Sequence, residues 1–198
     1  MSPSQVLEPT YHAIKQRLID GAWPWGYQLE ATKIATLLKT SVTPVRDSLH
    51  RLVGEHLVAF FPGRGFQVPQ VNEIELRDLF RLNLILLRAA IADRPQRSPG
   101  GVTEGTYPDQ ISDLFLQLAS RSRNGALVAA VTSLNERLHQ FRRCEPVLFA
   151  DLNSELGGLR AAAEKPSNSL LRSQIIQYHH RRSAEAAAYI RLMTPDSV

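Results

Sequence analysis

The sequence has a single cysteine, no long apolar run and only a small excess of charge of one sign. Cys144 is the only cysteine among its 198 residues, so no disulfide can form within the chain. The longest apolar stretch, Leu84–Ile91, contains Arg88 and is far too short to cross a bilayer. The first residues lack the basic segment and apolar run of a signal peptide. These absences predict a cytoplasmic protein with no membrane-spanning segment.

The composition is ordinary for a globular protein and sets only broad limits. Hydrophobic residues make up 43% of the chain and charged residues 21%, and the length allows one large domain or two small ones. The net charge is +4 and the isoelectric point about 9.5. Such an excess favours a nucleic-acid partner only if the positive charge gathers on one face.

Three short helices and a hairpin are predicted within the first seventy residues. Met1–Pro9 is polar, contains two prolines and is expected to be a loose tail. Pro44 suits the first turn of a helix, and Thr43 before it is expected to be the N-cap. Hydrophobic spacing and turn residues predict helices over Tyr11–Asp20, Ala31–Leu38 and Thr43–Gly54, a short strand at Tyr27–Leu29, and hairpin strands at Leu57–Phe61 and Gly65–Val68. This order is typical of a winged helix-turn-helix.

A helix-turn-helix places one helix in the major groove of DNA, where the residues of its first turn reach base edges. Arg46 lies in that turn and can bind a guanine edge or a phosphate through two parallel hydrogen bonds. Lys39 before the helix and Arg64 at the hairpin tip are placed for backbone or minor-groove contacts. An exposed arginine alone is usually only a solvated charge, so this prediction rests on the order of the elements. The candidate DNA-binding residues are Thr32, Lys39, Ser41, Val42, Thr43, Arg46, Gly63, Arg64 and Gly65.

From Glu73 onward the sequence is predicted to be entirely helical. A Pro/Gly/Ser-rich stretch, Asp93–Pro108, is expected to be a loop. Helices are predicted over Ile74–Ile91, Gln110–Arg121, Ala126–Arg143, Val147–Glu164 and Ser169–Met193. The predicted fold is therefore mainly α, with a DNA-binding domain at residues 1–71 and an all-helical domain at 72–198.

Several stretches of the N-terminal region match a known family in order and almost without gaps. They are Ile19–Gly21, Gly26–Glu30, Ile34–Ala35, Ser41–Leu49, Leu52, Gly54–Glu55, Leu57–Val58 and Pro62–Val68. On these residues, the segment from Ile14 to Val68 resembles the winged-helix domain of the GntR family of bacterial transcription regulators. The resemblance implies that Ser41, Thr43 and Arg46 contact DNA and that Gly63–Gly65 form the wing.

The chain departs from the family pattern at Val42, where the family usually has arginine. Valine lacks the two donors that arginine offers to a base, although it can contact a thymine methyl group. The departure implies an operator that differs from the usual family half-site, or weaker binding.

The helical region resembles the effector-binding and dimerisation domain of the FadR/FCD branch of this family. Many such domains hold a divalent metal with an aspartate and a histidine one helical turn apart and two later histidines, and the metal anchors a carboxylate effector. Here Asn135 and His139 occupy the first pair, Ala186 stands in the third position, and the fourth falls beyond Val198, so the domain is expected to be shortened. One histidine and one amide hold a metal poorly, so a metal is disfavoured.

Other positions of the helical region leave alternatives open. His179 or His180 could add one ligand, but the flanking Arg181 and Arg182 favour a solvated basic face. Two positions that are usually Arg and Glu in the family are Asn83 and Leu87 here. In one account, the pocket takes a more apolar effector or none. In the other, the apolar face of residues 79–91 is a dimer surface or a cover for the shortened domain. The candidate effector-binding residues are Asn83, Asn135 and His139.

These observations predict a homodimeric transcription regulator, and family precedent implies a repressor. It is expected to bind a near-palindromic operator and to respond to a small organic acid or a more apolar metabolite. No carboxylate pair, activated nucleophile or phosphate-binding glycine loop indicates an enzyme. The alternatives are a winged-helix module that binds protein and a helical protein that processes a ligand.

Overall fold

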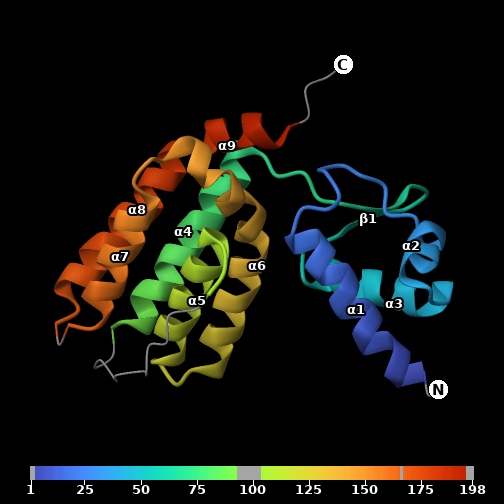
Figure 1. The fold of residues 1–198 in the computed structure, drawn as a ribbon, viewed down its shortest axis with the longest axis horizontal. Coiled ribbons are helices and arrows are strands. Elements are labelled where there is room, and N and C mark those ends of the chain that lie inside the picture. Colours follow the sequence, from blue (N-terminus) through green and yellow to red (C-terminus); the bar gives the residue numbers. More distant parts are fainter. Residues whose placement is uncertain (1–2, 93–103, 166, 195–198) are drawn as a thin grey trace. The chain divides into compact units, whose positions relative to one another are not determined.

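The computed structural model describes residues 3–92, 104–165 and 167–194. The chain divides into two compact units, the first built on the residues up to Gln70 and the second on Val71–Leu192 (Figure 1). Each unit has its own hydrophobic core and is described separately. The assignment of DNA binding to one unit and effector binding to the other stays a prediction.

The N-terminal unit contains three helices and a two-stranded antiparallel sheet. Its elements are α1 (Pro3–Ile19), α2 (Ala31–Leu38), α3 (Val42–Gly54), β1 (Ala59–Phe61) and β2 (Gly65–Gln67). In the sheet Phe60 lies opposite Phe66, and Gln28 forms a single bridge with Gln67. The helices bury one apolar stripe each around a shared core that includes Ile14, Leu18, Ile34, Val45, Leu49, Leu52 and Phe66.

Two expectations for this unit are wrong. The predicted loose tail is helical from Pro3, with Pro9 inside α1. In this stretch Glu8 accepts a hydrogen bond from Arg51 of α3 (2.8 Å), a contact between two helices that the local sequence pattern does not reveal. Thr43 is not the N-cap of α3; Ser41 is, in an extended conformation, and Pro44 is the third helical residue. Proline is tolerated at that position because the first N–H groups of a helix have no partner within it.

The second unit is helical in all its described regular elements. They are α4 (Glu73–Ala90), α5 (Tyr107–Ser120), α6 (Gly125–Leu148), α7 (Leu152–Ala163), α8 (Ser169–Ala184) and α9 (Ala186–Met193). Helix α4 contacts α5, α6 and α8, and α7 packs on α5 and α8. A capping box starts α4, in which Asn72 accepts from the N–H groups of Ile74 and Glu75 and the Glu75 carboxylate accepts from the Asn72 N–H.

Several helix boundaries in this unit differ from expectation. The helix predicted from Val147 begins only at Leu152, as α7, because Val147 belongs to α6. The predicted loop ends earlier, because α5 starts at Tyr107; residues 93–103 of that loop lie outside the described residues. Helix α6 continues through Pro146 to Leu148, since the fully buried Glu145 is paired with Arg182 and holds the last turns. The single helix expected over residues 169–193 is two, which are separated at Glu185.

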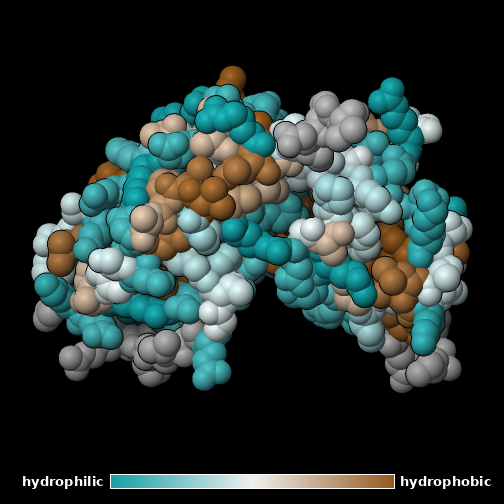
Figure 2. Space-filling view, turned by 45° about the horizontal axis from the view of Figure 1, so that its top comes forward, coloured by the Kyte–Doolittle hydropathy of each residue, from teal (hydrophilic) through white to brown (hydrophobic). Residues whose placement is uncertain are grey.

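The described surface is mostly hydrophilic on the face shown in Figure 2, with hydrophobic residues gathered in a few patches. Helix α4 has apolar residues on two sides, because Leu79 and Leu87 are buried in the core while Leu82 and Ile85 are exposed. No helix among the described residues is long and apolar enough to cross a membrane.

Candidate DNA-binding surface and polar interior of the helical unit

The first turn of α3 presents polar side chains to solvent. Ser41, Thr43 and Arg46 are exposed, while Val42 is half-buried and packs against the core of the N-terminal unit. The hydroxyl of Ser41 forms no side-chain cap hydrogen bond, so both the hydroxyl and the free N–H groups of the turn are open to a ligand. This end of the helix therefore has the dipole and the donors that suit a phosphate.

Three cations around this turn are exposed and have no carboxylate partner among the described residues: Lys39, Arg46 and Arg64. Lys39 is the C-cap of α2, and its left-handed backbone (φ 52°) ends that helix two residues before Ser41. Lys15, Lys33 and Arg51 of the same unit each pair with a glutamate; Lys33, for example, contacts Glu30 at 2.6 Å. Thr32, also predicted to bind DNA, is exposed in the first turn of α2.

The hairpin tip is a tight turn that holds Arg64 outward. The backbone N–H of Arg64 donates to the carbonyl of Phe61 (2.9 Å). Gly63 has a φ of 80°, which is the conformation that a type II turn requires of the residue after Pro62. The side chain of Gln28 donates to the Arg64 carbonyl and accepts from Gln67 (2.9 Å). Gln28 is thus a positioning residue of the wing that sequence reasoning did not identify.

Aromatic contacts join the exposed face of α3 to the hairpin. The His50 ring lies 5.6 Å from the Phe60 ring and 4.8 Å from the Phe66 ring. Arg46 precedes His50 by four residues, so both project from the same side of α3. The structure therefore places Arg46 on the side of α3 that borders the wing.

A polar cluster attaches α1 to the far end of α3. The Glu55 carboxylate accepts from the Tyr11 hydroxyl (2.7 Å) and from Lys15 (2.9 Å), and the Arg51 guanidinium lies 3.7 Å from the centre of the Tyr11 ring. Burial of the Glu55 carboxyl raises its pKa, but the hydrogen bonds from Lys15 and Tyr11 outweigh this and hold it below its usual value. Arg51 therefore belongs to this internal contact rather than to the DNA-facing group.

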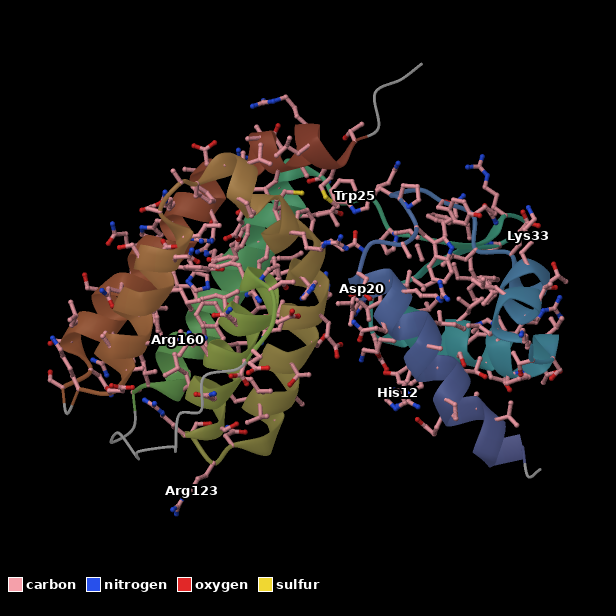
Figure 3. All side chains as sticks on the ribbon, viewed as in Figure 1. His12, Asp20, Trp25, Lys33, Arg123 and Arg160 are labelled. Atoms are coloured by element: carbon pink, nitrogen blue, oxygen red, sulfur yellow. The ribbon has the colours of Figure 1, made fainter. Side chains whose placement is uncertain are left out.

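Side chains fill the space between the helices of the second unit (Figure 3), and some of them are polar. Asn83 of α4 is fully buried, and its side-chain oxygen lies 2.8 Å from Nε2 of His179 in α8. Nδ1 of His179 lies 2.7 Å from the Ile175 carbonyl, which can only accept, so a neutral ring is protonated at Nδ1. Nε2 is then unprotonated and accepts a hydrogen bond. Its donor is the NH2 group of Asn83, once the side-chain amide is turned by 180° so that its nitrogen and oxygen exchange places.

Burial lowers the pKa of His179 to about 3, well below its ordinary 6.5. The unfolded chain therefore takes up a proton at this residue as the pH falls below 6.5, while the folded chain does so only near pH 3. The stability that this neutral histidine contributes is complete above pH 6.5 and is lost as the pH falls towards 3.

We expect the free energy of unfolding to fall by about 1.4 kcal/mol per pH unit between pH 6 and 4 because of His179 alone. His179→Gln should remove this part of the slope, measured by denaturant unfolding at several pH values. His180→Gln is the matched control, since His180 is exposed and next in sequence. Equal slopes for His179→Gln and the unchanged chain would contradict the assignment.

The other two predicted effector residues lie on α6 and are also engaged. Asn135 donates to the Ser112 carbonyl (2.8 Å) and accepts from Nη1 of Arg142 (3.0 Å). Nε2 of His139 lies 3.9 Å from a carboxylate oxygen of Asp109. The structure thus links Asn135 to Arg142, and it links Asn83 to His179. The Phe115 ring contacts both groups, because it stacks on His179 at 5.6 Å and lies 5.3 Å from the Arg142 guanidinium.

These side chains do not fit a divalent metal. The Asn135 oxygen already faces a guanidinium, whose positive charge repels a cation at the same position. Ala186, at the third ligand position, offers no donor. No group of three His, Cys, Asp or Glu within the described residues is arranged to hold a metal ion.

Arg181 and Arg182 do not form the solvated basic face that their sequence suggested. Arg182 is fully buried, and its Nε and Nη2 bind both carboxylate oxygens of Glu145 at 3.1 and 2.7 Å. It also binds Glu155 (2.7 Å) and the Tyr107 hydroxyl (2.8 Å). This arginine, which sequence reasoning missed, connects α8 to α5, α6 and α7. Of the four residues from His179 to Arg182, only His180 is exposed; Arg181 is half-buried.

Comparison with known proteins agrees with the described architecture. The family described as "Bacterial regulatory proteins, gntR family" matches residues 8–68. The HTH-type transcriptional regulator McbR of Escherichia coli (strain K12) is 25% identical over 177 residues, covering 84% of this chain and 76% of that protein. An uncharacterized HTH-type transcriptional regulator of Agrobacterium vitis is 30% identical over 80 residues, 40% of this chain and 47% of its own length.

Two solved structures have the same fold over most of the chain. E. coli McbR/YncC matches with a TM-score of 0.66 and 19% identity, covering 92% of this chain and 97% of that one. A regulator described as GntR from Rhodococcus sp. RHA1 matches with a TM-score of 0.72 and 15% identity over the same shares. The predicted mainly helical fold with an N-terminal winged helix-turn-helix is confirmed.

Proposed function

We propose that this DNA-binding transcription regulator is a homodimeric repressor controlled by a small effector. The match of residues 8–68 to the gntR family of bacterial regulatory proteins supports the proposal. The observation that carries the proposal is the group of exposed, unpaired cations around the first turn of α3. These are Lys39, Arg46 and Arg64, and the polar side chains of Ser41 and Thr43 lie between them along the chain.

In the proposed complex, α3 enters the major groove and the wing reaches the flanking backbone or the minor groove. Arg46 reads a base edge or binds a phosphate, and the other two cations bind phosphates. Two copies of the N-terminal unit bind a near-palindromic operator in the cytoplasm, because a dimer axis matches the axis of the operator.

The helical unit, which resembles the FadR/FCD branch, is proposed to supply dimerisation and effector binding. The exposed apolar residues Leu82 and Ile85 of α4 are the candidate dimer surface. An effector that binds more tightly to one arrangement of the two N-terminal units changes operator affinity by the same coupling free energy. No step of this mechanism requires an enzyme activity or a metal.

Selection of bound sequences from a random DNA pool tests the proposed function. Enrichment of one near-palindromic sequence, with binding that weakens as salt rises, is the expected result. Failure to enrich any sequence, or binding that does not depend on salt, would instead favour a winged-helix module that binds protein.

The same selection tests the role of Val42. Val42→Arg adds two donors at the first position of α3 and is expected to shift the enriched sequence towards the common family half-site, with a preference of about 1–3 kcal/mol at the affected base pair. Val53→Arg is the control, because it adds the same charge at a half-buried valine near the other end of the helix. An unchanged sequence profile for Val42→Arg would show that this position does not read DNA.

A further inference from the structure

The helical unit buries a second arginine, Arg142, which has no carboxylate partner among the described residues. Its side chain is fully buried, and its Nη1 donates to the Ser112 hydroxyl (2.7 Å) and to the Asn135 side chain (3.0 Å). Its Nε and Nη2 have no hydrogen-bond partner in the described part of the chain. Both acceptors that it does have are neutral, so its charge is not neutralised by direct contact.

The guanidinium group of Arg182, in the same unit, is neutralised by a carboxylate and serves as the comparison for Arg142. There the edge formed by Nε and Nη2 binds the two carboxylate oxygens of Glu145 side by side. In Arg142 this same edge is the one without partners. The unpaired edge of Arg142 therefore has the geometry that accepts one carboxylate through two parallel hydrogen bonds.

Nearby acidic residues are already engaged elsewhere. Glu145, three residues after Arg142 on α6, uses both oxygens on Arg182. Asp109 accepts from the Thr106 N–H and hydroxyl and lies beside His139. His179 stays neutral and supplies no charge, since burial lowers its pKa to about 3.

We propose that the Nε–Nη2 edge of Arg142 binds the carboxylate of a small organic acid inside the helical unit. A buried arginine without a counter-ion destabilises a protein, and an anion that binds there removes this penalty. The centre of the Phe115 ring lies 5.3 Å from the guanidinium, so the surroundings of the Arg142 side chain are partly apolar. The proposal rests on the proposed function, because it names the residue and the ligand charge for the effector site of the helical unit.

The burial of Arg142 also couples binding to packing. The side chain has no exposed surface, so an anion reaches it only when neighbouring helices separate locally. Helices α5 and α6 are the ones that Arg142 joins through Ser112, so they are the elements whose packing the ligand changes. This is a direct route from ligand binding to a change in the helical unit.

The test measures the melting temperature of the full chain with small acids and their amides at constant ionic strength. Acetate, butyrate and benzoate are compared with acetamide, butyramide and benzamide, which have nearly the same shape without the charge. At least one acid is expected to raise the melting temperature with increasing concentration, and no amide should do so. Absence of a response to every acid, or equal responses to acid and amide, would overturn the proposal.

Two variants assign the response to Arg142. Arg142→Met is expected to abolish the response and to raise the melting temperature of the ligand-free chain, because it removes an unneutralised buried charge. Arg142→Lys keeps the charge but loses the two-pronged edge, and it should weaken acid binding at least tenfold. Arg181→Met, which removes a more exposed arginine, should leave the response unchanged. A response retained in both Arg142 variants would overturn the assignment.

Operator binding separates this inference from the proposed function. If an acid raises the melting temperature through Arg142 but does not change operator affinity, the anion site at Arg142 is supported and control of operator binding by this effector is contradicted. If operator affinity responds to an acid equally in the unchanged chain and in Arg142→Met, effector control stands and Arg142 is not its anchor.

Discussion

Replacing Lys39, Arg46 and Arg64 together by alanine is expected to weaken operator binding at least about a hundredfold, or ~2.7 kcal/mol. All three side chains are exposed and have no carboxylate partner among the described residues, so they are available to DNA. A hydrogen bond to a charged group contributes about 1.5–3 kcal/mol, and each copy of the proposed dimer loses three such contacts.

Salt dependence distinguishes lost phosphate contacts from a lost base contact. The slope of log affinity against log salt concentration should become shallower by about 0.9 for each phosphate contact removed. Arg46→Ala alone should relax the sequence preference if this residue reads a base, whereas Lys39→Ala and Arg64→Ala should weaken binding to all sequences alike. Fluorescence anisotropy with the selected operator and a scrambled duplex measures both effects.

A triple variant of the helical unit controls for the loss of net charge. Arg123, Arg172 and Arg191 are exposed, and their replacement by alanine lowers the net charge by the same amount. Arg123 extends away from the loop between α5 and α6 (Figure 3). This control should retain operator binding within about threefold, because exposed charges that make no contact with DNA are largely screened at physiological salt. Equal losses in both triple variants would mean that binding depends on overall charge and not on the surface at α3.

The elements predicted best are those with regular apolar spacing and clear ends. Helix α2 has the predicted bounds, Ala31–Leu38, because its apolar stripe is complete and Lys39 ends it. The start of α3 was misplaced since Pro44 is tolerated anywhere in the first turn, which leaves the N-cap undetermined by proline alone. Contacts between residues distant in sequence accompany other errors, as near Pro9, where Glu8 binds Arg51 of another helix.

The interior charges of the helical unit were not predicted, although their positions followed the hydrophobic pattern. Arg182 continues the buried stripe of Ile175 and Tyr178, and Arg142 follows Leu138 on the buried side of α6. A charged residue at a position of the apolar stripe indicates either that the buried face of the helix ends there or that the charged side chain is buried with a partner on another element. The partner of Arg182 lies 37 residues away on another helix, so sequence spacing along one helix could not identify it.

The second large effect is expected from Arg182→Met, which should destabilise the helical unit by about 3–5 kcal/mol. Methionine fills much of the space left by the arginine stem but leaves the fully buried Glu145 carboxylate without its partner. The variant also removes hydrogen bonds to Glu155 and to the Tyr107 hydroxyl. Denaturant unfolding followed by far-ultraviolet circular dichroism measures the change in the free energy of unfolding.

The neighbouring Arg181→Met is the matched control for this variant. Arg181 pairs with Asp151, whose side chain is 56% exposed, so the loss should be below about 1 kcal/mol.

A second comparison isolates the cost of the unpaired carboxylate: Arg182→Met combined with Glu145→Leu should recover part of the stability, because no charge is then left buried without a partner. If Arg182→Met costs less than about 1 kcal/mol, or if the double variant is less stable than Arg182→Met, the ion cluster does not connect these helices as the contacts indicate. If Arg182→Met is the least stable variant and the double variant recovers stability, the ion pair with Glu145 neutralises Arg182. The two buried arginines of this unit then differ, because only Arg142 lacks a carboxylate partner among the described residues.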